Sequence, residues 1–364
     1  MQSKERMKKL TSKIKRSKKA EKPTRITNET VAEHRERILA GGRRFKYPVQ
    51  YTRHRLVWTA IAIGTVLAAI FLTVSWWQLY KAQTTDQFYY RVTRLLPLPV
   101  AQVDGEPVRY GDYLLYYKSS ETYLNTVERA NQAQYEGGDN RSLYDFHKAQ
   151  AMQTAVTDAF AQKLAGEHDI TISEDQIDEA FARTTQLSSD GSQISQEVID
   201  RSNEQLLGLT PADSRYIMKN SLLRKEVAYK IDNQARETSD KIKTALAKDK
   251  TTAFEELAKR YSEGEASEVQ VFVSGWVKKT NPDGGITEAA TKLEKGEVTG
   301  PIKPLKGDGY YFIRLLETND QNEVNYQVLM VPLTEFSRRL DALKQSDAVQ
   351  YYIDVPEVEQ QVKN

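Results

Sequence analysis

The sequence predicts an α+β protein in which a basic segment and a single transmembrane helix precede a folded body. Three observations lead to this prediction: an apolar run at residues 56–80, helical periodicity over residues 112–250, and a mixture of short strands and helices after residue 251. A length of 364 residues is enough for two domains or one large one. We expect a basic tail at 1–55, a transmembrane helix at 56–80, a helical domain at 81–238, a small α+β domain at 239–350 and a terminal tail at 351–364.

The apolar run from Leu56 to Tyr80 contains 25 residues and no charged side chain. A helix of about 20 apolar residues crosses the hydrocarbon core of a bilayer, so the run is long enough. Trp58 lies near one end and Trp76 and Trp77 near the other, where aromatic rings favour the membrane interface. The run lies far from the N-terminus, which favours an uncleaved anchor over a cleaved signal peptide.

Charge is distributed unevenly on the two sides of this run. Residues 1–55 carry 18 Lys and Arg against 5 Asp and Glu, a net charge of +13, whereas the other residues carry 34 against 45, a net charge of −11. The positive-inside rule therefore predicts a single-pass protein of the cell membrane, with a cytoplasmic N-terminus and an extracytoplasmic body. The basic tail either fixes this topology alone or also binds anionic lipid or nucleic acid through phosphate groups.

Composition excludes several kinds of chemistry. The chain has no cysteine, so it forms no disulfide, thiolate metal site or catalytic thiol. Its only histidines are His34, His54, His147 and His168, and only the last two lie in the expected extracytoplasmic body. Because these two are 21 residues apart and no carboxylate pair stands out, a metalloenzyme or a glycosidase is disfavoured. We expect no cofactor.

In the first part of the body, the turn and helix-boundary residues predict a β-hairpin followed by helices. Residues 81–96 are predicted to be helical up to the prolines at 97 and 99, which stop a helix. Asp104-Gly105 is typical of a tight turn between two short strands. A capping box at Ser173 predicts one later helix start, and Thr210 followed by Pro211 at the first helical position predicts another.

After residue 251 the pattern changes to short strands alternating with short helices. Residues 253–261 and 286–295 are predicted helices, and each is followed by a glycine. Runs of β-branched and aromatic residues predict strands at 269–276, 301–305, 309–316 and 324–331. Helical periodicity predicts a last helix at 335–343.

These two blocks together resemble the SurA/PrsA/PpiD group of foldases, which are secreted or attached to membranes. VAQVDGEPVRYGDY at 100–113 is similar to the opening of the SurA-like chaperone domain, and the segments at 170–178 and 209–227 support it. Four later segments resemble the parvulin, or PpiC-type, peptidyl-prolyl isomerase domain. They are AFEELAKRYSEG at 253–264, VSGW at 273–276, ITEAATKLEKGEVTGPI at 286–302 and GYYFIRLLE at 309–317.

The resemblance also implies positions for the isomerase site. Parvulins bind proline in an apolar cleft backed by two histidines and an Asp or Cys. Here the last-strand histidine is replaced by Tyr311, the Asp or Cys by Val273 and the cleft aromatic by Ile286. The substrate-binding residues implied by the resemblance are Trp276, Ile286, Tyr311 and Leu329. Most of the polar network is missing, so the catalytic residues stay unknown and the isomerase activity is expected to be weak or lost.

One strand of the parvulin pattern is displaced. Parvulin domains begin with a histidine-bearing strand, but residues 222–250 here continue as a helix. NYQVLMVPLTEFSRRLDALK at 325–344 resembles that strand and its helix, moved to the C-terminus, with Gln327 at the histidine position. Residues 318–323 are long enough for the hairpin loop that this arrangement requires. The alternative is an unrelated extra strand.

Two functions remain open at this point. The resemblance implies a membrane-anchored folding factor of the cell envelope that binds unfolded or newly translocated polypeptides, with lipid contacts through Leu56–Tyr80. The alternative is a non-catalytic scaffold that uses the same folds to bind one fixed partner. A broad preference for unfolded chains favours the first function, and one stoichiometric partner favours the second.

Overall fold

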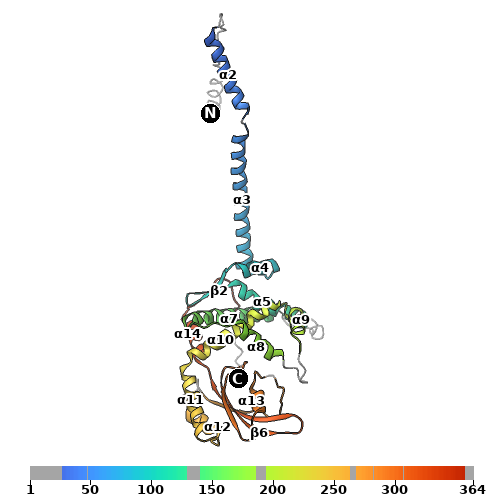
Figure 1. Cartoon of the computed structure of the whole chain (residues 1–364), viewed down its shortest axis with the longest axis vertical. Coiled ribbons are helices and arrows are strands. Elements are labelled where there is room, and N and C mark those ends of the chain that lie inside the picture. Colours follow the sequence, from blue (N-terminus) through green and yellow to red (C-terminus); the bar gives the residue numbers. More distant parts are fainter. Residues whose placement is uncertain are drawn as a thin grey trace. The chain divides into compact units, whose positions relative to one another are not determined.

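The computed structural model of the chain (Figure 1) describes residues 27–46, 48–128, 140–185, 194–262, 268–281, 283–305 and 307–356. The chain divides into two units, residues 1–75 and 76–364. Most of the expected basic tail and the end of the expected terminal tail lie outside the described residues, and so does any contact of residues 1–26 with lipid or nucleic acid.

The first unit contains two helices, α2 (Asn28–Lys46) and most of α3 (Pro48–Tyr80). Within α3, the 27 residues from His54 to Tyr80 have a mean hydropathy of 2.2. In the described part of the chain, this is the one helix that is long and apolar enough to cross a membrane. The hydroxyls of three threonines in this run donate to carbonyls of the preceding turn: Thr59, Thr65 and Thr73. These three hydroxyls are therefore satisfied within the helix itself.

The second unit begins with the last turn of α3 and contains a helical part. We define the helical part as residues 76–231 and 334–356. Its elements are α4 (Gln87–Leu95), β1 (Pro99–Val103), β2 (Glu106–Arg109), α5 (Tyr110–Tyr123), the π-helix η1 (Leu124–Glu128), α7 (Asn140–Glu167), α8 (Glu174–Thr185), α9 (Gln196–Leu207), α10 (Pro211–Ile231), α14 (Glu335–Gln345) and β8 (Val349–Tyr351). The capping boxes at Ser173 and Thr210 are both formed, so these two predicted helix starts are confirmed.

The C-terminal segment returns to this helical part. β8 pairs with β1, which completes the small sheet β2-β1-β8, and Leu340 of α14 is buried in the same core as Val100. The ring centroids of Phe160 and Phe336 are 5.3 Å apart. Residues 334–356 therefore pack with the helices, so the boundary expected at residue 350 is wrong.

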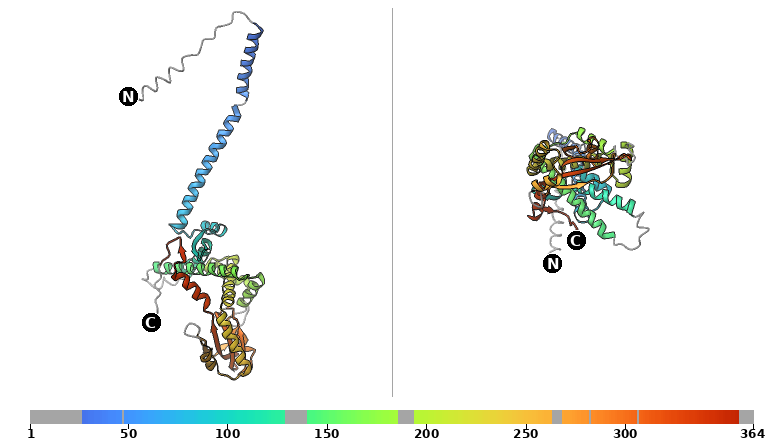
Figure 2. Two further views of the ribbon diagram at one scale, coloured as in Figure 1. Left: turned by 90° about the vertical axis from the view of Figure 1, so that its left-hand side faces the viewer. Right: turned by 90° about the horizontal axis from the view of Figure 1, so that it is seen from below.

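The sheet module, which we define as residues 232–333, comes between these two stretches in the sequence, and Figures 1 and 2 show its ribbons at the end of the second unit away from α4. Its elements are α11 (Asn233–Lys248), α12 (Phe254–Tyr261), β3 (Gln270–Val273), β4 (Val277–Lys278), α13 (Ile286–Thr291), β5 (Val298–Ile302), β6 (Gly309–Thr318) and β7 (Glu323–Pro332). The strand order is β3-β7-β6-β5, and β4 also pairs with β7. The predicted strand at 324–331 is thus confirmed, and it lies between β3 and β6.

Helices cover both faces of this sheet. Because side chains alternate along a strand, neighbouring residues of β7 belong to different faces. Leu329 packs with Phe254 and Leu257 on the face covered by α11 and α12, which we call the α12 face. Val328 packs with Ile286 on the opposite face, covered by α13, which we call the α13 face.

One buried carboxylate joins the two crossings between the helical part and the sheet module. Asp232 follows α10, and its side chain accepts the N–H of Ala235 in the first turn of α11 at 2.9 Å. The same carboxylate accepts the N–H groups of Thr334 at 2.8 Å and Glu335 at 3.1 Å, at the start of α14. A single side chain therefore caps two helix starts, which holds the outgoing and returning segments together.

Candidate functional site

The α13 face of the sheet holds an apolar cluster beside the start of α13. Its buried members come from α13, β6 and β7: Ile286, Ala290, Tyr311, Ile313, Leu315, Val324, Tyr326, Val328 and Met330. The N–H of Leu305 donates to the carbonyl of Gly284 at 2.9 Å, which holds this part of the β5–β6 connection against the start of α13. The described side chains of the cluster are therefore largely covered.

A polar network lies within this apolar surface. The carboxylate of Asp283 accepts hydrogen bonds from the hydroxyl of Tyr326 at 2.9 Å and the hydroxyl of Thr287 at 2.5 Å. It also accepts the backbone N–H of Thr287 at 2.9 Å, which caps the first turn of α13. Burial, together with the nearby Asp283 carboxylate, raises the pKa of Tyr326, so its hydroxyl stays protonated and donates.

A second hydroxyl lies on the same face, on β6. The hydroxyl of Tyr311 donates to the carboxylate of Asp308 at 3.1 Å. Burial, followed by the charge of Asp308, raises the pKa of Tyr311 from 10.0 to about 12. Both tyrosine hydroxyls of the face are therefore neutral near pH 7 and already donate to carboxylates of the protein.

The structure brings together only some of the residues expected at the site. Tyr311 and Ile286 belong to one cluster on the α13 face. Leu329 packs in the core of the α12 face, and the side chain of Gln327 donates to Glu255 of α12 at 2.6 Å. The expectation that Gln327 and Leu329 line the cleft is therefore wrong, because an odd-numbered position on β7 points away from α13.

Val273 also departs from the expected position. It lies directly opposite Gln327 on the paired strand β7, and opposed residues of an antiparallel pair point to the same face. Val273 is therefore on the α12 side and is 54 % exposed. Its neighbour Phe272 lies opposite Val328, so it is on the α13 side, and it is 44 % exposed.

Phe272 and Trp276 leave exposed aromatic surface at the β3 edge of the module. Trp276 was expected in the substrate-binding set and is exposed, whereas Phe272, Tyr326 and Asp283 were missed. The sequence does contain a signal for two of these residues. Alternation along the strand places Tyr326 on the same face as Val328, and Asp283 precedes Thr287 at a helix start. The missing piece was the strand register, which single-sequence patterns leave open.

The geometry is an antiparallel sheet with α11 and α12 on one face and α13 on the other. Residues 222–316 match the PPIC-type PPIase domain, the rotamase family. The parvulin-type domain thus starts within α10 and ends in β6, so the central strand β7 lies outside the matched segment. No curated protein and no solved structure matches the chain significantly.

The parvulin-type domain of this chain lacks imidazole and thiol groups. None of the four histidines lies within residues 222–333, and the chain has no cysteine. Among the described residues, no group of three or more His, Asp or Glu side chains is arranged to hold a metal ion. The polar groups available on the α13 face are therefore hydroxyls and carboxylates.

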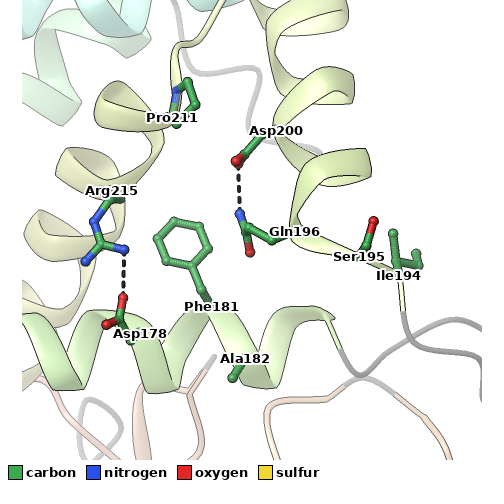
Figure 3. Close-up of a pocket in the computed structure, with 9 residues that line it drawn as sticks. All are labelled: Asp178, Phe181, Ala182, Ile194, Ser195, Gln196, Asp200, Pro211 and Arg215. Atoms are coloured by element: carbon green, nitrogen blue, oxygen red, sulfur yellow. Dashed lines mark hydrogen bonds and ion pairs between the residues drawn. The ribbon is translucent and has the colours of Figure 1, made fainter.

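A separate cavity lies in the helical part, between α8, α9 and the start of α10 (Figure 3). Its volume is about 520 Å³, and Figure 3 shows the ring of Phe181 between Arg215 and Gln196. The guanidinium carbon of Arg215 lies 6.0 Å from the centre of that ring, and its nitrogens pair with Asp178 at 2.7 Å and Glu174 at 2.6 Å. The walls combine apolar surface with fixed charges.

The two helices beside this cavity are acidic. Helices α8 and α9 carry seven carboxylates but only the two arginines at 183 and 201. The side chain of Gln196 donates to Asp200 at 2.8 Å across the first turn of α9. Because acidic side chains exceed basic ones here, the cavity favours ligands that combine an apolar group with positive charge.

Proposed function

We propose that this chain is a membrane-anchored, extracytoplasmic folding factor whose parvulin-type domain binds unfolded polypeptides and retains little isomerase activity. The observation that carries the proposal is the α13 face of a PPIC-type domain. This face carries a buried apolar cluster, and Phe272 is exposed on the same side of the sheet, while the hydroxyls of the face already donate within the protein. Apolar surface favours binding, and occupied donors disfavour catalysis.

Isomerisation makes a specific demand on the site. The barrier to rotation about a peptide bond is about 18–20 kcal/mol, and catalysis requires tighter binding of the twisted amide than of either planar form. Apolar side chains can bind the proline ring, but they do not stabilise the charge distribution that the amide acquires when it is twisted. Tyr311 and Tyr326 donate to Asp308 and Asp283, so neither hydroxyl is directed at a substrate amide. We therefore infer weak catalysis with retained binding.

The helical part supplies a second binding surface in this proposal. The cavity between α8, α9 and α10 is large enough for one or two side chains, and its acidic surroundings favour basic clients. Unfolded chains present apolar and basic side chains next to each other, so the two surfaces act on the same class of client. The SurA-like character of the helical part belongs to this proposal.

Membrane attachment rests on α3 and on the charge distribution. The run His54–Tyr80 is long enough to span a bilayer, and the basic residues precede it. We infer that residues 1–55 are cytoplasmic and that the chain from about residue 82 onward is extracytoplasmic. Protease added outside intact cells is expected to degrade the second unit and to leave the N-terminal segment intact; a protected C-terminus would reverse this topology.

Two assays on the full chain in lipid vesicles test the proposed function. Suppression of aggregation of a chemically denatured client is expected, whereas prolyl isomerisation should be far slower than with a parvulin that has both histidines. Tyr311→His alone should restore little, because networks of polar groups act together. An isomerisation rate comparable to the parvulin's would contradict the proposal. Binding of one stoichiometric partner, without suppression of aggregation, would favour the scaffold function.

A further inference from the structure

The last turn of α3 is fixed to the helical part by buried contacts. Leu79 is buried in the core, and its carbonyl accepts the hydroxyl of Tyr110 at 2.5 Å. The hydroxyl of Tyr80 donates to the carbonyl of Pro99 at 2.7 Å, and its ring packs edge-on against Tyr110 with centroids 5.7 Å apart. This turn and the helical part therefore move together, and the helical part keeps one side next to the end of α3.

Helix α4 lies beside that turn, and its inner face is held by polar contacts (Figure 1). The hydroxyl of Tyr90 donates to Asp213 at 2.9 Å, and a guanidinium nitrogen of Arg94 lies 3.5 Å from the same carboxylate. Thr93 is buried against Gly111, where a Cβ atom would lie only 2.6 Å from the carbonyl oxygen of Thr93. These contacts fix the rotation of α4 about its own axis.

The opposite face of α4 carries large apolar side chains in solvent. Leu95 is 84 % exposed and Phe88 is 51 % exposed, and Leu96, the extended residue that follows the helix, is 52 % exposed. Phe88, Arg91 and Leu95 are three and four residues apart, so they lie along one side of the helix. Arg91 is exposed between the two apolar residues. Apolar side chains flanking a cation are typical of helices that lie in a membrane interface.

We propose that this outer face of α4 lies in the lipid interface and seats the second unit on the membrane surface. The inference rests on the proposed membrane anchoring of α3. Only six residues join Tyr80 to Gln87, and Trp76 and Trp77 are exposed on the last turn of α3, where tryptophan favours the interface. The occupant is therefore lipid, continuous with the bilayer around α3: acyl chains cover Phe88 and Leu95, and a headgroup phosphate pairs with Arg91.

The absence of cysteine from the chain allows a direct test. Single-cysteine variants of the full chain are labelled with a fluorophore and inserted into phosphatidylcholine–phosphatidylglycerol vesicles that contain a nitroxide lipid quencher. Leu95→Cys reports on the outer face of α4, and Leu96→Cys reports on the exposed residue that follows the helix. Val273→Cys is the matched control, because Val273 is 54 % exposed, about as much as Leu96, but lies on the sheet module at the other end of the second unit (Figures 1 and 2). Ile63→Cys reports on α3.

Strong lipid quenching is expected at positions 95 and 96 and at 63, with little at 273, and aqueous iodide should quench only the label at 273. Quenching at 63 without quenching at 95 and 96 would overturn the lipid contact and leave the membrane anchor standing. If iodide is also excluded from 95 and 96 in that case, a protein partner covers the face instead. No lipid quenching at 63 would overturn both the anchor and this inference.

Discussion

On β7, two neighbouring residues belong to two different environments. Leu329 is fully buried among Phe254, Leu257 and Ile242 on the α12 face, where the core cluster is apolar apart from the rings of Tyr229 and Tyr310. Met330 lies on the α13 face, in a cluster that also holds the hydroxyls of Tyr311 and Tyr326. The same strand therefore supplies a closed core to one side and a polar, partly open surface to the other.

The difference shows which face carries the fold and which carries the site. A buried polar group that loses its partner costs about 1–3 kcal/mol, so a sheet gains nothing from hydroxyls that apolar side chains could replace. The α12 face comes closer to this rule, because its core cluster is apolar except for tyrosines, and the hydroxyl of Tyr229 donates to the carbonyl of Gly309 at 2.5 Å. The α13 face departs from it at Asp283, Thr287 and Tyr326, and it ends in exposed Phe272, which is what a binding surface requires.

The largest effect is expected on the closed face. Leu329→Ala should lower the free energy of unfolding of the sheet module by about 3 kcal/mol, because it removes buried methyl groups and leaves a cavity. Denaturant-induced unfolding, monitored by hydrogen exchange of the backbone amides of β6, measures the loss. Leu329→Met is the control, since a volume-conserving exchange should cost less than about 1.5 kcal/mol. Equal losses for both variants would mean that this face is not closely packed.

A smaller loss is expected on the polar face. Tyr326→Phe removes a hydroxyl that donates to Asp283, so the free energy of unfolding should fall by about 1–2 kcal/mol. A double-mutant cycle with Thr287→Val measures whether the two hydroxyls act as one network. Additive losses would show that Tyr326 and Thr287 contribute independently, which would weaken the distinction drawn between the two faces.

Sequence patterns predicted much of this architecture because its signals are local. The helix starts at Ser173 and Thr210, the apolar run in α3 and the displaced strand at 324–331 were all readable from short segments. The domain boundary near residue 350 was wrong because α14 has a polar surface with one apolar stripe. Such a stripe indicates burial, but it does not tell which of two cores receives it.

The site was harder to predict because it depends on strand register. A shift of one residue moves every side chain of a strand to the other face. The resemblance put Gln327 in the cleft, but the pairing of β7 with β3 and β6 puts Tyr326 and Val328 there instead. Ile286 and Tyr311 do lie in one cluster on the α13 face, and each belongs to a segment with its own recognisable motif.

The exposed β3 edge allows a third comparison between the two faces, in binding rather than in the free energy of unfolding. Phe272→Ala should weaken binding of a reduced, carboxymethylated client by about three- to tenfold, up to ~1.4 kcal/mol, because Phe272 is on the α13 side. Val273→Ala is the matched control, since Val273 is adjacent and similarly exposed but is on the other side. Fluorescence anisotropy of the labelled client measures both. Equal weakening by the two variants would show that clients do not distinguish the faces.

The smallest effect is confined to alkaline pH and concerns Tyr311. Burial and Asp308 raise the pKa of Tyr311 from 10.0 to about 12, so between these pH values the unfolded chain loses a proton that the folded chain keeps. The contribution of this tyrosine to stability is therefore complete below pH 10 and is lost as the pH rises toward 12. Tyr311→Phe removes the ionisable group. Between pH 10 and 12, the unfolding free energy of the parent chain should therefore fall relative to that of the variant. Thermal unfolding at a series of pH values from 8 to about 11.5 measures this difference. Parallel curves for the two chains would mean that the Tyr311 hydroxyl titrates normally, and hence that the α13 face is more open to water than its buried cluster indicates.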